Sequence, residues 1–153
     1  MEEDEYKSTY NELASVRCVF EKALTNNQAK CCLSRHFCLA DREGYSCEDA
    51  GSSMKCSKLL EKLRKKSTFV LKLHNVDGPL PHNMEIRVQV GGVIGLAKLL
   101  TSGADNLNTA TSIDNINGII DQVIKKYGSL ERLPYSEIIQ SVEQFQGRRR
   151  RQR

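Results

Sequence analysis

Residues 18–56 read CVFEKALTNNQAKCCLSRHFCLADREGYSCEDAGSSMKC, and this stretch contains every cysteine of the 153-residue chain. Cysteines that only fill an apolar core would scatter along the sequence, whereas thiols that share one ligand must gather in space. The confinement to one stretch therefore predicts a local thiol site. The six residues are Cys18, Cys31, Cys32, Cys38, Cys47 and Cys56.

The spacing of the thiols, C-x12-C-C-x5-C-x8-C-x8-C, matches no common metal motif. It lacks the paired C-x2-4-C knuckles of structural zinc sites and the cysteine runs of ferredoxins. The adjacent Cys31 and Cys32 are not a C-x-x-C pair, which disfavours a thioredoxin-like dithiol. The argument must therefore rest on the placement of the cysteines and not on a motif.

The compartment decides how the thiols are interpreted. The N-terminus, Met-Glu-Glu-Asp-Glu, is acidic and unlike a signal peptide, and no apolar run approaches the roughly 20 residues that span a bilayer. We expect a cytoplasmic protein that is not in a membrane. A reducing cytosol favours metal binding over disulfides, with thiol redox chemistry and plain packing as the alternatives.

The preferred ligand set is Cys18, either Cys31 or Cys32, Cys47 and Cys56, with Cys38 in reserve. Cys18 lies off the apolar stripe of its expected helix, so packing gives no reason for a cysteine there. Four soft thiolates suit an iron–sulfur cluster, and zinc is the alternative. The dispersed spacing favours the cluster.

Three helices are expected before residue 66. Apolar residues at a helical period predict helices over about 6–24 and 28–42, the second burying Leu33 and Phe37. Ser52 or Ser53 would cap a third helix that carries Cys56 and several leucines. Turn-forming residues between the second and third helices predict a loop.

The β structure is expected near residues 68–90. Met84, Ile86, Val88 and Val90 alternate with polar residues, which predicts a half-buried strand that ends at Gly91. Residues 68–73 fit either a continued helix or a second strand, which would form a hairpin across the proline-containing loop 74–83. Residues 93–100 would then start a short helix.

The fold class that follows is a small, mainly α domain of five to six helices with one short β-hairpin or strand near 68–90. We expect a cysteine-containing helical domain over 1–100, a linker or flexible loop over 101–112 and a C-terminal helical pair over 113–146 that packs on the domain. Gly128 would end the first helix of the pair and Pro134 would open the second.

Other residues offer weaker sites. His36 could complete a mixed Cys/His zinc site but fits a surface histidine better, and His74 and His82 lack a third ligand. The glycine-rich residues 91–95 match no phosphate-binding motif, so close helix packing explains them better. No catalytic arrangement is visible, and we lean against an enzyme.

The tail 147–153 is basic and expected to be disordered, with Arg148, Arg149, Arg150, Arg151 and Arg153 available to phosphates or acidic groups. The sequence thus predicts a non-catalytic, cysteine-ligated metalloprotein, most simply an iron–sulfur protein for electron transfer, sensing or structural stability. The alternative is an adaptor or regulatory protein, with structural zinc or packed cysteines, whose tail binds an acidic protein partner or nucleic acid.

Overall fold

The computed structural model describes residues 2–13, 16–26, 28–73, 80–100 and 113–145. Helices dominate these residues, and the only sheet among them is a two-stranded antiparallel hairpin. The mainly α class predicted from the sequence is therefore confirmed. In order along the chain, the elements are α1 (Glu3–Leu13), α2 (Glu21–Thr25), β1 (Ser34–Leu39), β2 (Arg42–Cys47), α3 (Ala50–Lys66), α4 (His82–Leu100), α5 (Ile116–Tyr127), the 3-10 helix η2 (Leu130–Arg132) and α6 (Tyr135–Gln144).

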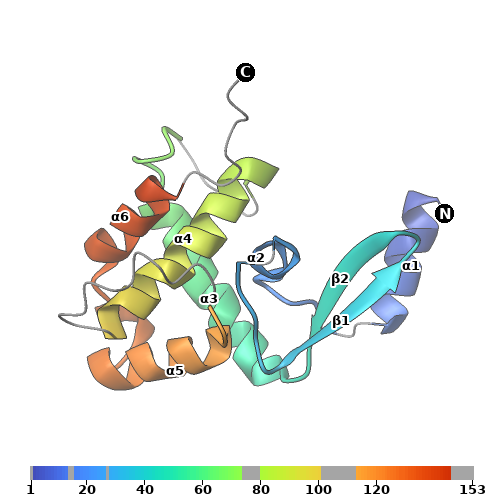
Figure 1. Cartoon of the computed structure of the whole chain (residues 1–153), viewed down its shortest axis with the longest axis horizontal. Helices are drawn as coiled ribbons and strands as arrows, with labels where there is room; N and C mark the ends of the chain where they lie inside the picture. The colour runs from blue at the N-terminus through green and yellow to red at the C-terminus, as the bar shows by residue number, and fades with distance from the viewer. Residues whose placement is uncertain (1, 14–15, 27, 74–79, 101–112, 146–153) are drawn as a thin grey trace.

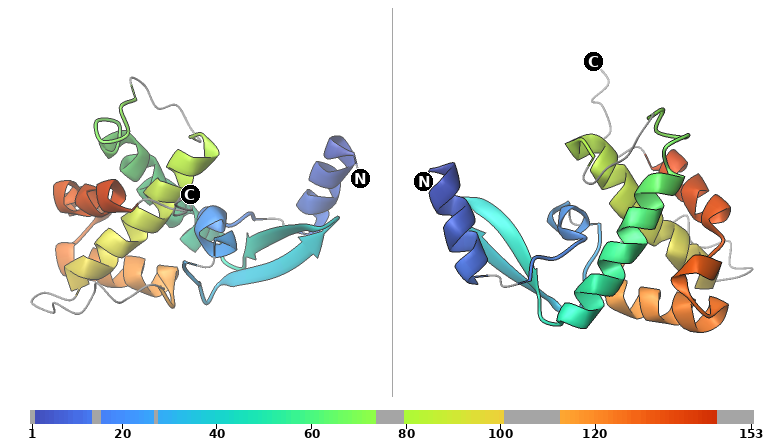
Figure 2. Two further views of the ribbon diagram at one scale, coloured as in Figure 1. Left: turned by 45° about the horizontal axis from the view of Figure 1, so that its top comes forward. Right: turned by 180° about the vertical axis from the view of Figure 1, so that it is seen from behind.

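The molecule has two parts. Helices α3 to α6 pack together into a helical body, whereas the hairpin and α1 project away from it, with α2 between them (Figures 1 and 2). Arg42 on β2 pairs with Glu3 on α1 across 3.1 Å. The hairpin meets the body at its foot, where β1 begins and β2 ends.

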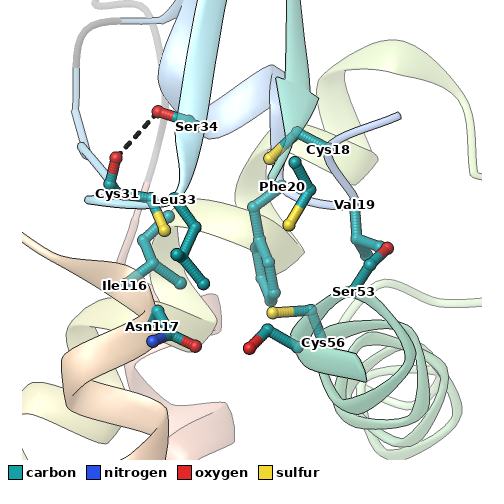
Figure 3. Close-up of a pocket in the computed structure, with 12 residues that line it drawn as sticks. Cys18, Val19, Phe20, Cys31, Leu33, Ser34, Ser53, Cys56, Ile116 and Asn117 are labelled. Atoms are coloured by element: carbon teal, nitrogen blue, oxygen red, sulfur yellow. Dashed lines mark hydrogen bonds between the residues drawn. The ribbon is translucent and has the colours of Figure 1, made fainter. Parts of the chain in front are cut away.

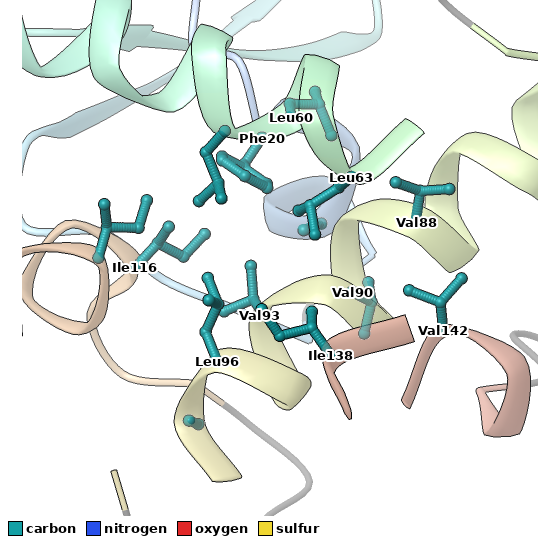
Figure 4. Packing of buried hydrophobic residues seen from close by; sticks show 14 of the residues in the cluster. Phe20, Leu60, Leu63, Val88, Val90, Val93, Leu96, Ile116, Ile138 and Val142 are labelled. Carbon is teal, nitrogen blue, oxygen red and sulfur yellow. The ribbon is translucent and has the colours of Figure 1, made fainter. Parts of the chain in front are cut away.

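The hydrophobic core lies within the helical body and includes Phe20, which precedes α2 (Figure 4). None of the buried apolar side chains of the described residues comes from the hairpin. The core therefore includes α2, whereas the hairpin reaches it only through partly buried residues such as Tyr45. The largest fully buried apolar side chains are Phe20, Leu59, Leu60, Leu63, Leu96, Ile116, Ile120, Ile138, Val88, Val90 and Val93.

The hairpin stands where the sequence predicted a helix over 28–42, so that prediction was wrong. β1 and β2 are in register from Ser34↔Cys47 to Leu39↔Arg42, which leaves Ala40 and Asp41 as a two-residue turn. Both turn residues have positive φ, 50° and 66°, as the tight turns favoured by hairpins require.

The predicted helix over 6–24 is broken into α1 and α2. Between them, Arg17 forms an antiparallel bridge with Ser46, so the chain adds a short third segment to β2. Backbone pairing with the hairpin foot replaces helical hydrogen bonds at this point. Because of this break, Cys18 lies in the segment between α1 and α2 and not on a helix.

The strand predicted over 84–90 is also wrong, because these residues belong to α4. Glu85 and Gln89 are one helical turn apart and both buried, and Gln89 donates to Glu85 across 3.1 Å. Gly91 lies in the middle of this helix, where a Cβ atom would come within 2.6 Å of the Cα of Val142 on α6. The glycines thus serve close helix packing, and they do not end a strand.

Residues 67–72 form successive turns after α3, so no hairpin forms across the proline loop among the described residues on either side of it. Residues 74–79 and the expected linker 101–112 lie outside the described residues.

The cap of α3 is Asp49, and not Ser52 or Ser53 as the sequence suggested. The Asp49 carboxylate accepts a hydrogen bond from the Ser52 N–H across 3.1 Å. The C-terminal pair formed as predicted: Gly128 ends α5 with φ 96°, and α6 follows Pro134.

Candidate metal centre

Four of the six thiols line one pocket at the foot of the hairpin: Cys18, Cys31, Cys47 and Cys56. Cys18 precedes α2, Cys31 precedes β1, Cys47 ends β2 and Cys56 lies on α3. Figure 3 shows the sulfur atoms of Cys18, Cys31 and Cys56 directed toward the same space. The structure thus gathers thiols that are up to 38 positions apart in the sequence into one site.

Backbone pairing at the hairpin foot positions two of these thiols. The Cys18 N–H donates to the Tyr45 carbonyl across 3.0 Å, and the Cys47 N–H donates to the Val16 carbonyl across 2.8 Å. The reciprocal bonds hold residues 16–18 against the end of β2. Cys18 and Cys47 therefore enter the pocket from adjacent extended segments.

The start of α5 positions Cys31. The Lys30 N–H donates to the Ile113 carbonyl across 2.7 Å, and the Ile116 N–H donates to the Lys30 carbonyl across 2.9 Å. The next residue, Cys32, donates its N–H to the Asn115 side chain across 3.1 Å. A segment before β1 is thereby fixed to a helix that lies more than 80 residues later in the chain.

The pocket wall is mostly apolar, with a few small polar groups. Its apolar members are Val19, Phe20, Leu33 and Ile116, and its polar members are Ser34, Ser52, Ser53 and Asn117. The space that water can enter is about 20 Å³. This is room for about one water molecule.

Burial keeps two of the thiols protonated. Burial raises the pKa of Cys18 to about 12, while the Phe20 N–H acts in the opposite direction. Burial also raises the pKa of Cys56 to about 12, with neighbouring Cys31 and Cys47 adding to the rise. Ligand thiols must lose their protons when they bind a metal, so binding here is coupled to proton release.

Two helices begin at the wall of the thiol pocket. Ser52 and Ser53 in the first turn of α3, and Ile116 and Asn117 in the first turn of α5, all line the pocket. The N-terminal end of a helix carries partial positive charge and favours nearby anions. At α3 this positive end already faces the carboxylate of Asp49, whereas the N-cap of α5 makes no side-chain hydrogen bond.

The four thiols surround a space and do not converge on a point. Among the residues that the structure describes, no group of three or more His, Cys, Asp or Glu side chains is placed to hold a single metal ion. A zinc ion would need all four sulfurs at about 2.3 Å from its centre. The arrangement of the described residues therefore lacks the geometry of a preformed metal site, for zinc or for another metal.

The other predicted ligands lie elsewhere. Cys32 and Cys38 are exposed and do not line the pocket, and Cys38 pairs with Glu43 in the hairpin register. His36 lies on the hairpin with its ring 5.0 Å from that of Tyr45. His82 contacts Lys22 across 3.0 Å. His74 and the arginines of the tail 147–153 lie outside the described residues.

The sequence did not reveal the polar residues that hold this region together. Gln89 accepts from the Ala23 N–H across 3.1 Å, which ties α2 to α4. Arg64 on α3 donates to both carboxylate oxygens of Glu85 across 3.1 Å, and the Leu80 N–H also donates to Glu85. The only sign of them in the sequence is the spacing of Glu85 and Gln89, which are four residues apart in an apolar stretch. The same spacing is also compatible with a strand.

These polar residues border a second, larger cleft beside the thiols. Its volume is about 560 Å³, and Cys18 and Val19 belong to its wall as well as to that of the thiol pocket. Its buried Glu85 is fully engaged by Arg64, Gln89 and the Leu80 N–H.

None of the described helices is both long and apolar enough to cross a lipid bilayer. Comparison of the chain with protein-family models, with curated proteins and with solved structures found no match. The four thiols at the foot of the hairpin are therefore the feature of the molecule that bears most directly on its function.

Proposed function

We propose that this protein is a non-catalytic iron–sulfur protein whose cluster is bound by Cys18, Cys31, Cys47 and Cys56. The observation that carries the proposal is the gathering of these four thiols around one pocket while Cys32 and Cys38 point elsewhere. Four cysteines are the usual ligands of both two-iron and four-iron clusters. Electron transfer, sensing and structural stabilisation are the roles that such a site supports.

A zinc ion and an iron–sulfur cluster require different distances between the thiols that bind them. Sulfurs that bind one zinc ion lie about 4 Å from one another, because each is about 2.3 Å from the metal. In a four-iron cluster each thiolate binds a different iron atom, so the sulfurs stand farther apart. The four thiols line one pocket but are not placed to hold a metal as they stand among the described residues, so either group would require them to move, and the preference for a cluster rests on their dispersed positions in the sequence.

Cluster insertion requires the site to widen, since the free space holds about one water molecule. Three of the four thiols lie at or beside the hairpin foot, and the hairpin supplies none of the described core residues. Widening would have to displace Tyr45, Cys18 and Cys31, which are partly buried against the core. The protons of the four S–H groups leave at the same time.

The test is anaerobic reconstitution with iron and sulfide, followed by metal and sulfide analysis. We expect brown protein that absorbs at about 400 nm, as thiolate-bound clusters do. Cys18→Ser, Cys31→Ser, Cys47→Ser and Cys56→Ser should each lower bound iron severely. The chain supplies matched controls, because Cys32→Ser and Cys38→Ser should retain the wild-type iron content.

Two results would contradict the proposal. Colourless protein that carries one zinc ion per chain would move the assignment to a structural zinc site with the same ligands. Protein that stays free of metal after reconstitution, with no change in stability on adding a chelator, would leave the cysteines as packing residues.

A further inference from the structure

The turn that follows α3 presents an aromatic side chain to solvent. Phe69 is 90% exposed, and it and Met54 are the two exposed large apolar residues of the described part of the chain. The turn begins about 25 Å from the start of α3, which lies at the hairpin foot (Figure 2). This surface is therefore remote from the thiol pocket, and its role does not depend on the thiols.

Phe69 is held in this position by a turn that is anchored on both sides. Ser67 is buried, and its hydroxyl donates to the Leu63 carbonyl across 2.6 Å. Leu71 is also buried, and its N–H donates to the Ser67 carbonyl across 3.0 Å. These anchors fix the backbone between them. Because the Phe69 ring adds almost nothing to the core, packing does not explain an aromatic residue here.

Exposed lysines surround this ring. Lys65 and Lys66 precede it by four and three residues, the spacing of neighbouring side chains on a helical surface. Lys72 donates its N–H to the Phe69 carbonyl across 3.2 Å. Lys65 pairs with a carboxylate one turn earlier, whereas Lys66 and Lys72 form no ion pair with another described residue. Residues 58–72 contain six Lys or Arg and one Glu, so their net charge is +5.

We propose that the Phe69 turn, residues 65–72, binds the surface of an anionic lipid bilayer. Its positive charge is complementary to acidic lipid headgroups, which attract clusters of lysine and arginine. The apolar ring among the lysines is suited to enter the boundary between headgroups and acyl chains. A single exposed apolar residue is ordinary on a protein surface, but an exposed aromatic ring with a rim of lysines has the composition of an interfacial segment.

The exposure of the ring favours a bilayer over a nucleic acid. Proteins that stack aromatic side chains on bases carry them in a positively charged groove that follows the strand. Phe69 leaves 90% of its surface free and lies in a chain turn, so it projects from the protein and does not form the floor of a groove. A projecting ring fits a soft layer that closes around it.

Flotation of the full-length protein with lipid vesicles tests the proposal. We expect binding to phosphatidylcholine vesicles that contain phosphatidylserine, little binding to phosphatidylcholine alone, and weaker binding at high salt. Phe69→Ala should lower the affinity about tenfold, since the buried ring is lost. Lys66→Gln and Lys72→Gln should each lower it about fivefold, since each removes one charge near the lipid surface.

Matched controls lie at the other end of α3. Met54 is 63% exposed in the first turns of this helix, so Met54→Ala removes an exposed apolar side chain away from the turn. Lys125 is exposed on α5, which the Lys55–Asp121 pair joins to the same end of α3. Neither Met54→Ala nor Lys125→Gln should change the affinity. Removing residues 148–153 measures the share of the basic tail and should leave the tenfold effect of Phe69→Ala intact.

A second readout reports insertion directly. The chain contains no tryptophan, so Phe69→Trp introduces a single fluorescent reporter. Its emission should move to shorter wavelength on phosphatidylserine vesicles and should be quenched by brominated acyl chains. Met54→Trp should show neither change.

Several results would overturn the proposal. The first is wild-type protein that binds no better when phosphatidylserine is present, and the second is an equal loss of binding in Phe69→Ala and Met54→Ala. The third is Phe69→Trp emission that vesicles leave unchanged. Binding to a single-stranded oligonucleotide that depends on Phe69, in protein that ignores vesicles, would assign the turn to nucleic acid instead.

Discussion

Glu85 shows how one buried charge can be held in the folded state. Its side chain is 1% exposed, and three neighbours donate hydrogen bonds to its carboxylate: Arg64, Gln89 and the Leu80 N–H. Burial alone would raise the pKa of Glu85, but these hydrogen bonds outweigh it and hold the pKa below its ordinary value of 4.5. The ionised form is therefore the one that the fold prefers.

This preference predicts how stability depends on acid. Because the folded pKa is lowered, the stabilisation by Glu85 is present above its unfolded pKa and is lost as the pH falls through the folded value, below 4.5. Glu85→Gln should cost about 3 kcal/mol at neutral pH, since Arg64 would lose its charged partner. The variant should also lose less stability than the wild type below pH 4.5.

Urea unfolding followed by far-ultraviolet circular dichroism measures both effects, at neutral pH and at about pH 3. Glu61→Gln is the control, because Glu61 forms an exposed pair with Lys65 on α3 and should change stability little. A Glu85→Gln protein with wild-type stability and wild-type acid sensitivity would remove the structural role of this carboxylate.

At the scale of elements, local patterns predicted the C-terminal helices and missed the β structure. The isoleucine stripe of α5, Gly128 and Pro134 are signals within a few residues of each other, so the sequence alone located α5 and α6. The hairpin was missed because Leu33 and Phe37 are four apart, as in a helix, and because its turn is Ala-Asp and not Asn-Gly.

α4 was mistaken for a strand for a different reason. Its apolar residues do alternate near its start, but the polar residues between them include Glu85 and Gln89, which are buried. Their partners are Arg64 on α3 and the Ala23 N–H in α2. Contacts with distant segments therefore favour a helix over residues 84–90. Such contacts cannot be read from the local sequence pattern.

The grouping of the thiols was predictable in part. Confinement to residues 18–56 and the off-stripe place of Cys18 indicated a site, and the structure brings Cys18, Cys47 and Cys56 together. The choice between Cys31 and Cys32 depended on the tie between residues 28–32 and the start of α5. These hydrogen bonds join residues 28–32 to residues 113–116, which are far apart in the sequence, so no local pattern predicts them.

The turn of the hairpin can be tested directly. Ala40 and Asp41 have positive φ, which costs residues with a Cβ atom energy that glycine and asparagine avoid in part. Replacing them by Asn-Gly should stabilise the hairpin by about 1 kcal/mol. Amide hydrogen exchange of β1 and β2 measures the gain, and Ala40→Val should have the opposite effect. Equal exchange in all three proteins would argue against a tight turn here.

At the scale of the whole molecule, stability is unevenly distributed. The helical body has the apolar core, whereas the hairpin relies on its own ladder and on its foot. An isolated two-stranded hairpin is at best marginally stable in water. Ligation of the four thiols would therefore hold the hairpin to the body.

If the proposed cluster is bound, removing it should loosen one part of the molecule and spare the other. We expect the amides of residues 34–47 to lose protection from hydrogen exchange in cluster-free protein, while those of α4 and α6 keep it. Mass spectrometry of the cluster-loaded and chelated forms makes the comparison. If the protection of α4 and α6 falls as much as that of the hairpin, the site is part of the global core and not a local clamp.

The wall that α5 contributes to the pocket bears on how the protein is made. The last of the four thiols is Cys56, yet Ile116 and Asn117 complete the enclosure. A growing chain on the ribosome therefore presents all its thiols before the residues that shelter them have been synthesised. A cluster inserted at that stage would stand open to water and oxygen on one side. The order of the chain thus favours loading after release, when α5 has docked.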